Sequence, residues 1–148
     1  MPSTYSQILF HLIFATKNRE PLILDAWRPQ LHEYLGNTVV GLGGTALAVG
    51  GVRDHVHLLV GLKPTHRLSD FMRELKKASS IWVGKEIGAT GFAWQEGYGA
   101  FTVSASARDS VRNYIRGQEE HHRRKTSRLE LVEILRQCDV AYEDRYLD

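Results

Sequence analysis

Two histidines at alternate positions, His55 and His57, are the first candidates for chemistry in this sequence of 148 residues. They open the apolar stretch 55–62 (HVHLLVGL), whose composition predicts a strand. Residues i and i+2 of a strand face the same way, so both imidazoles would project from one face of a sheet. Such a pair is suited to bind a metal ion. Two surface histidines on a half-exposed strand are the alternative.

A second candidate group lies in the basic segment around Tyr114. Tyr114 and Gln118 are four residues apart, so on a helix they share a face. A phenol, with a free pKa of about 10, becomes a usable nucleophile beside a divalent cation in a positive field. Gln118 offers a carbonyl oxygen as a third metal ligand, and His121 and His122 compete for that place. Two histidines with a glutamine suit Mg²⁺ or Mn²⁺ better than a closed zinc site. The alternative role of Tyr114 is packing.

Basic residues gather in the segments 63–85 and 108–128, although the net charge of the chain is only +2. Such segments predict a surface that binds a polyanion, with solvated helix faces as the alternative. The aromatic and glycine-rich stretch 94–101 would either stack on unpaired bases or cover the edge of the core. The candidates for contacts with DNA phosphates are Arg67, Arg73, Lys76, Lys77, Arg112, Arg116, Arg123 and Arg124.

The hydrophobic pattern predicts the elements that must position these residues. Strands are expected at 5–16, 45–52, 55–62 and 100–104. Helices are expected from an N-cap at Asp25 to about residue 40, at 68–85, from an N-cap at Ser106 to about residue 123, and at 129–138. This order is typical of an α+β, ferredoxin-like fold. Its antiparallel sheet would have helices packed on one face, leaving the other face free to carry a site.

The composition predicts one domain over residues 1–148, with 43% hydrophobic and 24% charged residues. Cys138 is the single cysteine, which excludes an internal disulfide and favours the cytoplasm. No apolar run approaches the roughly 18 residues of a membrane span. No basic region precedes the first apolar stretch, so neither a signal peptide nor a membrane partner is expected.

Taken in order, several segments resemble the single-tyrosine HUH transposases of small bacterial insertion sequences and the related repeat-associated tyrosine transposases. The segments that carry the resemblance are His11 with Phe14–Arg19, Asp54–His57, Leu68–Arg73, Trp94–Tyr98 and the pattern Tyr114-Ile115-x-x-Gln118-Glu119-x-His121-His122. No single segment is decisive, but the ordered set is specific and extends over most of the chain.

The resemblance implies that His55 and His57 are the HUH metal ligands, with Gln118 as third ligand and Mg²⁺ or Mn²⁺ as the cofactor. It also implies that Tyr114 attacks a phosphodiester of single-stranded DNA, which leaves a 5′-phosphotyrosine link and a free 3′-OH. Members of this group form homodimers, in which the tyrosine helix of one subunit often completes the site of the other. They recognise small DNA hairpins near the ends of the element.

Two other functions fit the same sequence. The first is a non-catalytic protein that binds single-stranded DNA or RNA on the same fold, with the histidines at the surface. Such proteins stack bases on aromatic residues of the sheet, whereas the candidate strand here carries His55 and His57. The second is a domesticated nuclease that cleaves DNA without mobility.

Overall fold

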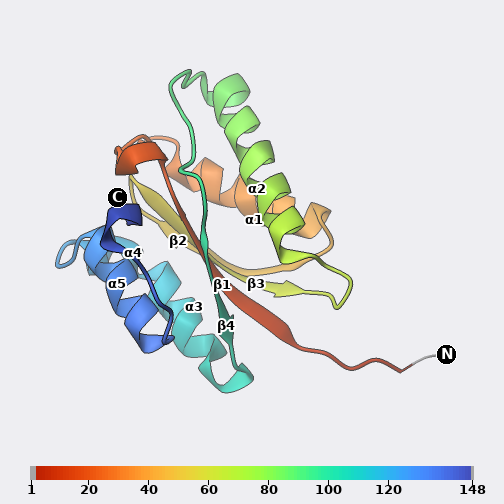
Figure 1. Cartoon of the computed structure of the whole chain (residues 1–148). Coiled ribbons are helices and arrows are strands. Elements are labelled where there is room, and N and C mark those ends of the chain that lie inside the picture. The colour runs from red at the N-terminus through yellow and green to blue at the C-terminus, as the bar shows by residue number, and fades with distance from the viewer. Residues whose placement is uncertain (1–2, 148) are drawn as a thin grey trace.

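The fold is built on a four-stranded antiparallel sheet, seen in a computed structural model that describes residues 3–147 (Figure 1). The strands are β1 (Ile8–Ala15), β2 (Thr45–Gly51), β3 (His55–Leu62) and β4 (Gly99–Val103). Their order across the sheet is β2-β3-β1-β4, and both central strands pair antiparallel with their neighbours. The predicted ferredoxin-like α+β fold is confirmed.

Helices α1 (Arg28–Gly41) and α2 (Leu68–Trp82) lie together on one face of the sheet (Figure 1). Alternate residues of the central strands, such as Leu12 and Leu58, point to this face and pack against both helices. Met72 of α2 and Leu35 of α1 are fully buried in the same cluster. This layer is the main hydrophobic core and matches the predicted packing of helices on one face.

The opposite face, expected to be open, is covered by three further helices (Figure 1). These are α3 (Arg108–Arg116), α4 (Gln118–His122) and α5 (Ser127–Gln137). The expectation failed because this face is also apolar: Leu59 packs on Ile115 of α3, and Ile13 packs on Val132 of α5. Such side chains gain free energy when helices shield them from water.

Several element ends differ from the sequence prediction. The helix expected from Ser106 to about residue 123 is divided at Gly117 into α3 and α4, and neither Ser106 nor Asp25 caps a helix. Thr126 caps α5 instead, since its hydroxyl accepts a hydrogen bond from the backbone N–H of Leu129 at 3.2 Å. Short helical turns complete the chain at Lys17–Arg19, Val83–Ile87, Ala105–Ala107 and Asp144–Tyr146. None of the helices in the described residues has the length and apolar character needed to cross a bilayer.

Close contact between α3 and β2 depends on a residue without a side chain. A Cβ atom at Gly50 would lie 2.0 Å from the carbonyl oxygen of Ile115 and 2.9 Å from its carbonyl carbon. Both atoms belong to the backbone of α3, so they cannot move aside as a side chain would. Gly50 therefore sets how closely the helix that carries Tyr114 approaches the sheet.

We expect Gly50→Ala to lower the free energy of unfolding by about 1–3 kcal/mol, because the added methyl group pushes α3 away from β2. Gly36→Ala is the matched control: its Cβ would make only ordinary contacts, 3.8 Å from Val49 and 3.9 Å from Ala46, inside helix α1. That control should stabilise the protein by about 0.5–1 kcal/mol. Urea unfolding measures both, and equal stability of the two variants would contradict the close contact.

Candidate functional site

His55 and His57 lie side by side on β3, on the face that α3, α4 and α5 cover. Both are buried, with 1% and 0% of their surface exposed, so the alternative of two surface histidines is wrong. Their ring centroids are 4.9 Å apart. On its other side, Nδ1 of His57 lies 2.7 Å from Nε2 of His11, another buried residue of this face. The predicted projection of both imidazoles from one face is therefore correct.

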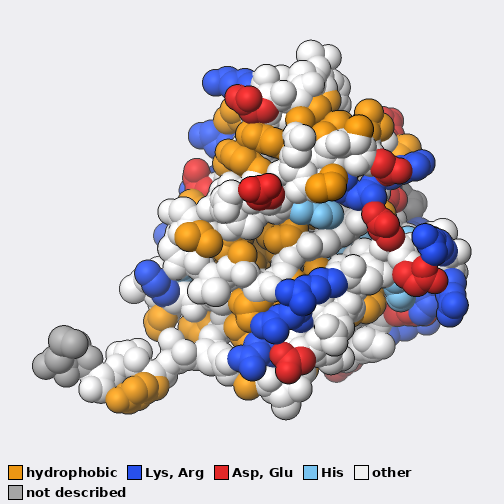
Figure 2. Space-filling view, turned by 180° about the vertical axis from the view of Figure 1, so that it is seen from behind, with side chains coloured by type: hydrophobic (Ala, Val, Ile, Leu, Met, Phe, Trp, Pro, Cys, Tyr) orange, Lys and Arg blue, Asp and Glu red, His pale blue; other side chains and the backbone are white. Residues whose placement is uncertain are grey.

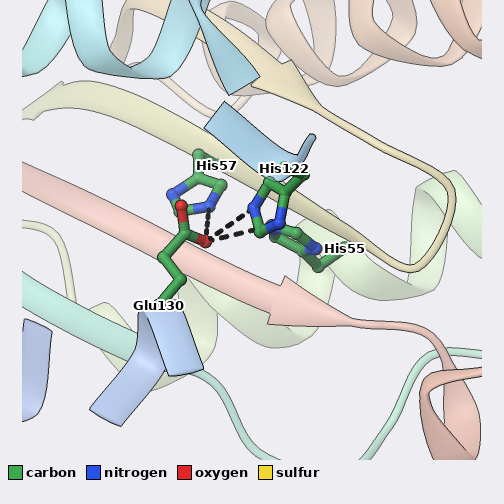
Figure 3. A group of neighbouring side chains, drawn as sticks. All are labelled: His55, His57, His122 and Glu130. Carbon is green, nitrogen blue, oxygen red and sulfur yellow. Dashed lines mark hydrogen bonds and ion pairs between the residues drawn. The ribbon is translucent and has the colours of Figure 1, made fainter. Parts of the chain in front are cut away.

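Glu130 of α5 brings a carboxylate to this pair, as Figure 3 shows. Its Oε1 atom lies 2.9 Å from Nε2 of His57 and 3.2 Å from Nε2 of His55. The same atom lies 3.1 Å from Nε2 of His122, at the end of α4. The sequence does not single out Glu130, because helical spacing places it on a face of α5 without indicating that this face lies on the histidines.

Tyr114 also reaches this group of side chains. Its hydroxyl donates a short hydrogen bond to Oε2 of Glu130 and lies 3.4 Å from Nε2 of His121. The tyrosine ring is 5.8 Å from the ring of His57, centroid to centroid. The tyrosine and the histidine pair of one chain thus lie in the same site.

Gln118 is buried at the start of α4, next to the same residues. Its Oε1 atom lies 3.3 Å from Nε2 of His55 and 3.0 Å from Nε2 of His122. Its Nε2 donates to Oε2 of Glu130 at 3.1 Å. Tyr114 and Gln118 therefore lie on the same side despite the break at Gly117, as their spacing of four residues predicted.

The two strand histidines have opposite pKa shifts. Burial lowers the pKa of His55, but hydrogen bonds to Asp54 and Glu130 outweigh it and raise the pKa to about 9. Burial dominates at His57 and lowers its pKa to about 4, against the opposing hydrogen bond to Glu130. We assign His57 as neutral, with Nε2–H donating to Glu130 and Nδ1 accepting from His11. His55 donates from both ring nitrogens.

The carboxylate and the phenol are shifted as well. Burial raises the pKa of Glu130, but hydrogen bonds from His122, His55 and His57 outweigh it and hold that pKa far below its usual range. Burial and the hydrogen bond to Glu130 raise the pKa of Tyr114 well above its usual value. Without a metal ion, Glu130 is thus ionised and Tyr114 is protonated at neutral pH.

A chain of polar contacts fixes α5 against β3. Oδ1 of Asp54 accepts from Nδ1 of His55 at 2.7 Å, and Oδ2 of Asp54 accepts from the hydroxyl of Ser127 at 3.0 Å. Arg19 donates to the Ser127 hydroxyl at 3.0 Å and to the backbone carbonyl of Leu147 at 2.7 Å. Asp54 therefore orients His55 and also holds the first turn of the helix that carries Glu130.

The donor set fits a divalent cation. Ligand atoms of His55, His57, His122 and Glu130 all lie within 4.8 Å of one another. Adjacent corners of an octahedron whose ligands are about 2.1 Å from the ion are about 3 Å apart, close to the contacts around Oε1 of Glu130. Nitrogen and carboxylate oxygen together suit Mn²⁺, Mg²⁺ or zinc.

The basic residues singled out in the sequence do not form one surface. Arg67 directly precedes α2, and Arg73, Lys76 and Lys77 lie on it, behind the sheet as seen from the site. Nζ of Lys76 donates hydrogen bonds to the backbone carbonyls of Gln95 and Gly97, at 2.7 and 2.9 Å. Lys and Arg side chains form a short row over α3 in Figure 2. Of the eight candidates, those on the site's side of the sheet are Arg112 and Arg116 of α3 with Arg123 and Arg124, which follow α4.

The two aromatic residues Trp94 and Tyr98 of the stretch 94–101 lie in different surroundings. Trp94 covers the core edge: its ring lies 4.6 Å from that of Phe14, and its Nε1 donates to Ser79 at 2.9 Å. Tyr98 is 41% exposed and lines a cavity of about 610 Å³. His55 and Glu130 line the same cavity, which therefore opens beside the site.

Comparison with known proteins identifies the family. The family described as "Transposase IS200 like" matches residues 4–118, most of the chain. This chain belongs to that family, and the resemblance to single-tyrosine transposases is confirmed. Members of a transposase family are DNA-cleaving enzymes.

Relatives of known sequence agree. The ISDra2 transposase TnpA of Deinococcus radiodurans is 29% identical over 120 residues, which cover 77% of this chain and 86% of that protein. The transposase for insertion sequence element IS200 of Salmonella typhimurium is 26% identical over 117 residues, covering 75% and 76%.

Solved structures agree in fold. A crystal structure from Deinococcus radiodurans, described as a transposase, has a TM-score of 0.64 and 29% identity, and the match covers 78% of this chain and 93% of that one. A REP-associated tyrosine transposase bound to a REP hairpin has a TM-score of 0.56 at 16% identity, covering 78% and 68%. The second likeness concerns the fold alone.

The opposite shifts of the two histidines predict their titration in the metal-free protein. With EDTA present, histidine ring NMR should show His55 losing its proton near pH 9 and His57 gaining one only near pH 4. The stability from His55 is complete below its unfolded pKa of about 6.5 and is lost as pH rises through 9. The stability that depends on neutral, buried His57 is present above about pH 6.5 and is lost as pH falls from there through 4. Titration of both rings near 6.5 would contradict this arrangement.

Proposed function

We propose that this chain is a metal-dependent transposase that cleaves and rejoins single-stranded DNA through a 5′-phosphotyrosine intermediate. Tyr114 is the nucleophile, and His55, His57 and Gln118 hold Mg²⁺ or Mn²⁺. The observation that carries the proposal is that the Tyr114 hydroxyl and Nε2 of both histidines contact the same carboxylate. A nucleophile and a metal site are thereby within reach of one phosphate. Residues 1–148 act as one domain in the cytoplasm, where the exposed thiol of Cys138 stays reduced.

The residues of the chain divide the chemistry between them. Tyr114 supplies the oxygen that forms a bond to phosphorus, and its phenolic proton passes to Oε2 of Glu130, which already accepts its hydrogen bond. The bond from phosphorus to the 3′ oxygen breaks, and that oxygen takes up a proton to leave as the 3′-OH. The metal, when bound, polarises the phosphate and offsets the charge that develops on it. His121 and Glu130 hold the tyrosine hydroxyl from two sides, at 3.4 Å and through a short hydrogen bond. The covalent link conserves the energy of the broken bond, so no nucleotide cofactor is needed.

The substrate is single-stranded DNA with hairpin ends. The site is buried under α3, α4 and α5, and the cavity beside it is lined by Tyr98, which can stack on an unpaired base. In a continuous duplex the bases are paired and stacked on one another, so none is free to stack on Tyr98. The fold neighbour bound to a REP hairpin supports a hairpin partner.

Phosphate contacts come from the site's side of the sheet. Arg112 and Arg116 lie on α3, which also carries Tyr114, and Arg123 and Arg124 follow α4, so we assign DNA binding to them first. The basic residues on or directly before α2, namely Arg67, Arg73, Lys76 and Lys77, would contact a different part of the DNA, because the sheet separates them from the site. A nuclease without mobility would use this same site.

Substitution of the tyrosine tests the nucleophile. Tyr114→Phe should abolish the covalent protein–DNA adduct, because the variant lacks the attacking oxygen. It should leave hairpin binding nearly unchanged, since one hydroxyl is lost. Single-stranded hairpin DNA with Mg²⁺, followed by a denaturing gel, measures the adduct, and fluorescence anisotropy measures binding.

Three controls accompany this experiment. Tyr98→Phe, at the exposed tyrosine of the cavity, should keep the adduct. Wild-type protein should form none with EDTA present or with blunt duplex of the same sequence. An adduct on the Tyr114→Phe variant would assign the nucleophile elsewhere, and equal cleavage in EDTA would exclude the metal.

Site assembly can be tested separately. The resemblance implies a homodimer with the tyrosine helix acting in trans, whereas the contacts of Tyr114 with Glu130 and His121 of the same chain support completion in cis. We propose cis completion within each subunit of a homodimer. Mixing His57→Ala with Tyr114→Phe protein, with subunit exchange, should then restore no adduct. Recovery of up to about a quarter of wild-type activity would show trans assembly.

A further inference from the structure

Glu130 lies beyond the part of the chain that matches the family, which ends at residue 118. Its carboxylate is nevertheless the centre of the site: Nε2 atoms of His55, His57 and His122 surround Oε1, and the Tyr114 hydroxyl binds Oε2 (Figure 3). We propose that Glu130 is a metal ligand of this transposase, so that α5 supplies an essential donor to the ion. This inference rests on the proposed metal-dependent function and specifies which residues bind the ion.

Distances support direct coordination. Oε1 of Glu130 lies 2.9–3.2 Å from the three imidazole nitrogens, which matches the spacing of about 3 Å between adjacent ligand atoms on a small divalent ion. An ion placed between His55, His57 and Glu130 would take the place of the protons that now join them. Gln118 stays within the same group through its Oε1, 3.0 Å from His122.

The negative charge of Glu130 also supports its role as a metal ligand. His55, His57 and Gln118 can offer only neutral donor atoms to a dication, and all three are at most 1% exposed. A dication held there by neutral groups alone would keep little of the solvation that water gives it. Glu130, itself 2% exposed, adds a negative charge and the hard oxygen donor that Mg²⁺ and Mn²⁺ prefer.

Contacts of other residues of α5 also hold the Glu130 carboxylate in place. Ser127, one turn earlier in α5, donates to Asp54, and Asp54 binds the far nitrogen of His55. Val132 and Leu135 pack the same helix against Ile13 and Phe101. The site and α5 are therefore joined on both sides of Glu130. The opposing role is structural, in which Glu130 only neutralises buried histidines and fixes α5.

The experiment measures binding of Mn²⁺ alone, without DNA, to the full chain by isothermal titration calorimetry. Glu130→Gln keeps the size of the side chain and removes its charge. It should weaken Mn²⁺ binding at least tenfold and reduce the rise in melting temperature that Mn²⁺ produces. Glu133→Gln is the matched control: it lies on the same helix, 41% exposed and paired with Lys125, and should bind Mn²⁺ like the wild type.

The variants distinguish failure of this inference from failure of the proposed function. If Glu130→Gln binds Mn²⁺ as tightly as the wild type while His57→Ala does not, Glu130 is structural and the proposed function stands. If His57→Ala also binds like the wild type, or the wild type does not bind, the metal role of the whole site is wrong.

If Glu130→Gln does not fold, as circular dichroism would show, Glu130→Asp decides: it keeps the charge but withdraws the oxygen by one methylene. Unchanged Mn²⁺ affinity of that variant refutes coordination, and a severalfold loss supports it.

Discussion

The alternation of side chains along β3 is the constraint on which both layers of this molecule depend. Val56, Leu58 and Val60 face α1 and α2, and the residues between them face the other way. This second face carries His55 and His57 next to apolar Leu59, so it needs a cover that excludes water. Helices α3, α4 and α5 supply the cover, and they therefore lie directly on the imidazoles.

Covering polar groups has a cost that the cover itself must offset. Buried imidazoles and a buried carboxylate lose their hydration, and they are tolerated only with good hydrogen-bond partners. Glu130 satisfies His55 and His57 through Oε1, while Oε2 accepts from Tyr114 and Gln118. The opposite pKa shifts of the two histidines follow, because one imidazole has carboxylates on both sides and the other has only one. The same contacts that compensate burial gather the groups needed for chemistry.

The close approach at Gly50 and the helix break at Gly117 define how α3 and α4 lie over the sheet. At Gly50 the backbone of α3 comes so near to β2 that no side chain fits between them, which fixes the distance of Tyr114 from the sheet. At Gly117 the helix breaks, and α4 begins with Gln118 directed toward His55. Tyr114, the histidine pair and Glu130 thus come from one strand and two helices of a single chain, and this geometry is the basis for proposing cis completion.

The sequence by itself determined the order of the elements, the common face of His55 and His57, and the shared side of Tyr114 and Gln118. Each of these follows from local periodicity, because a strand repeats every two residues and a helix about every 3.6. Only the tertiary structure decided that the second sheet face is covered, that the two basic segments lie on opposite sides of the sheet, and that Glu130 meets His57. Glu130 and His57 are 73 positions apart in the sequence. Periodicity tells which face of a helix is apolar, but the element that this face meets is decided by packing between distant segments, which no local pattern records.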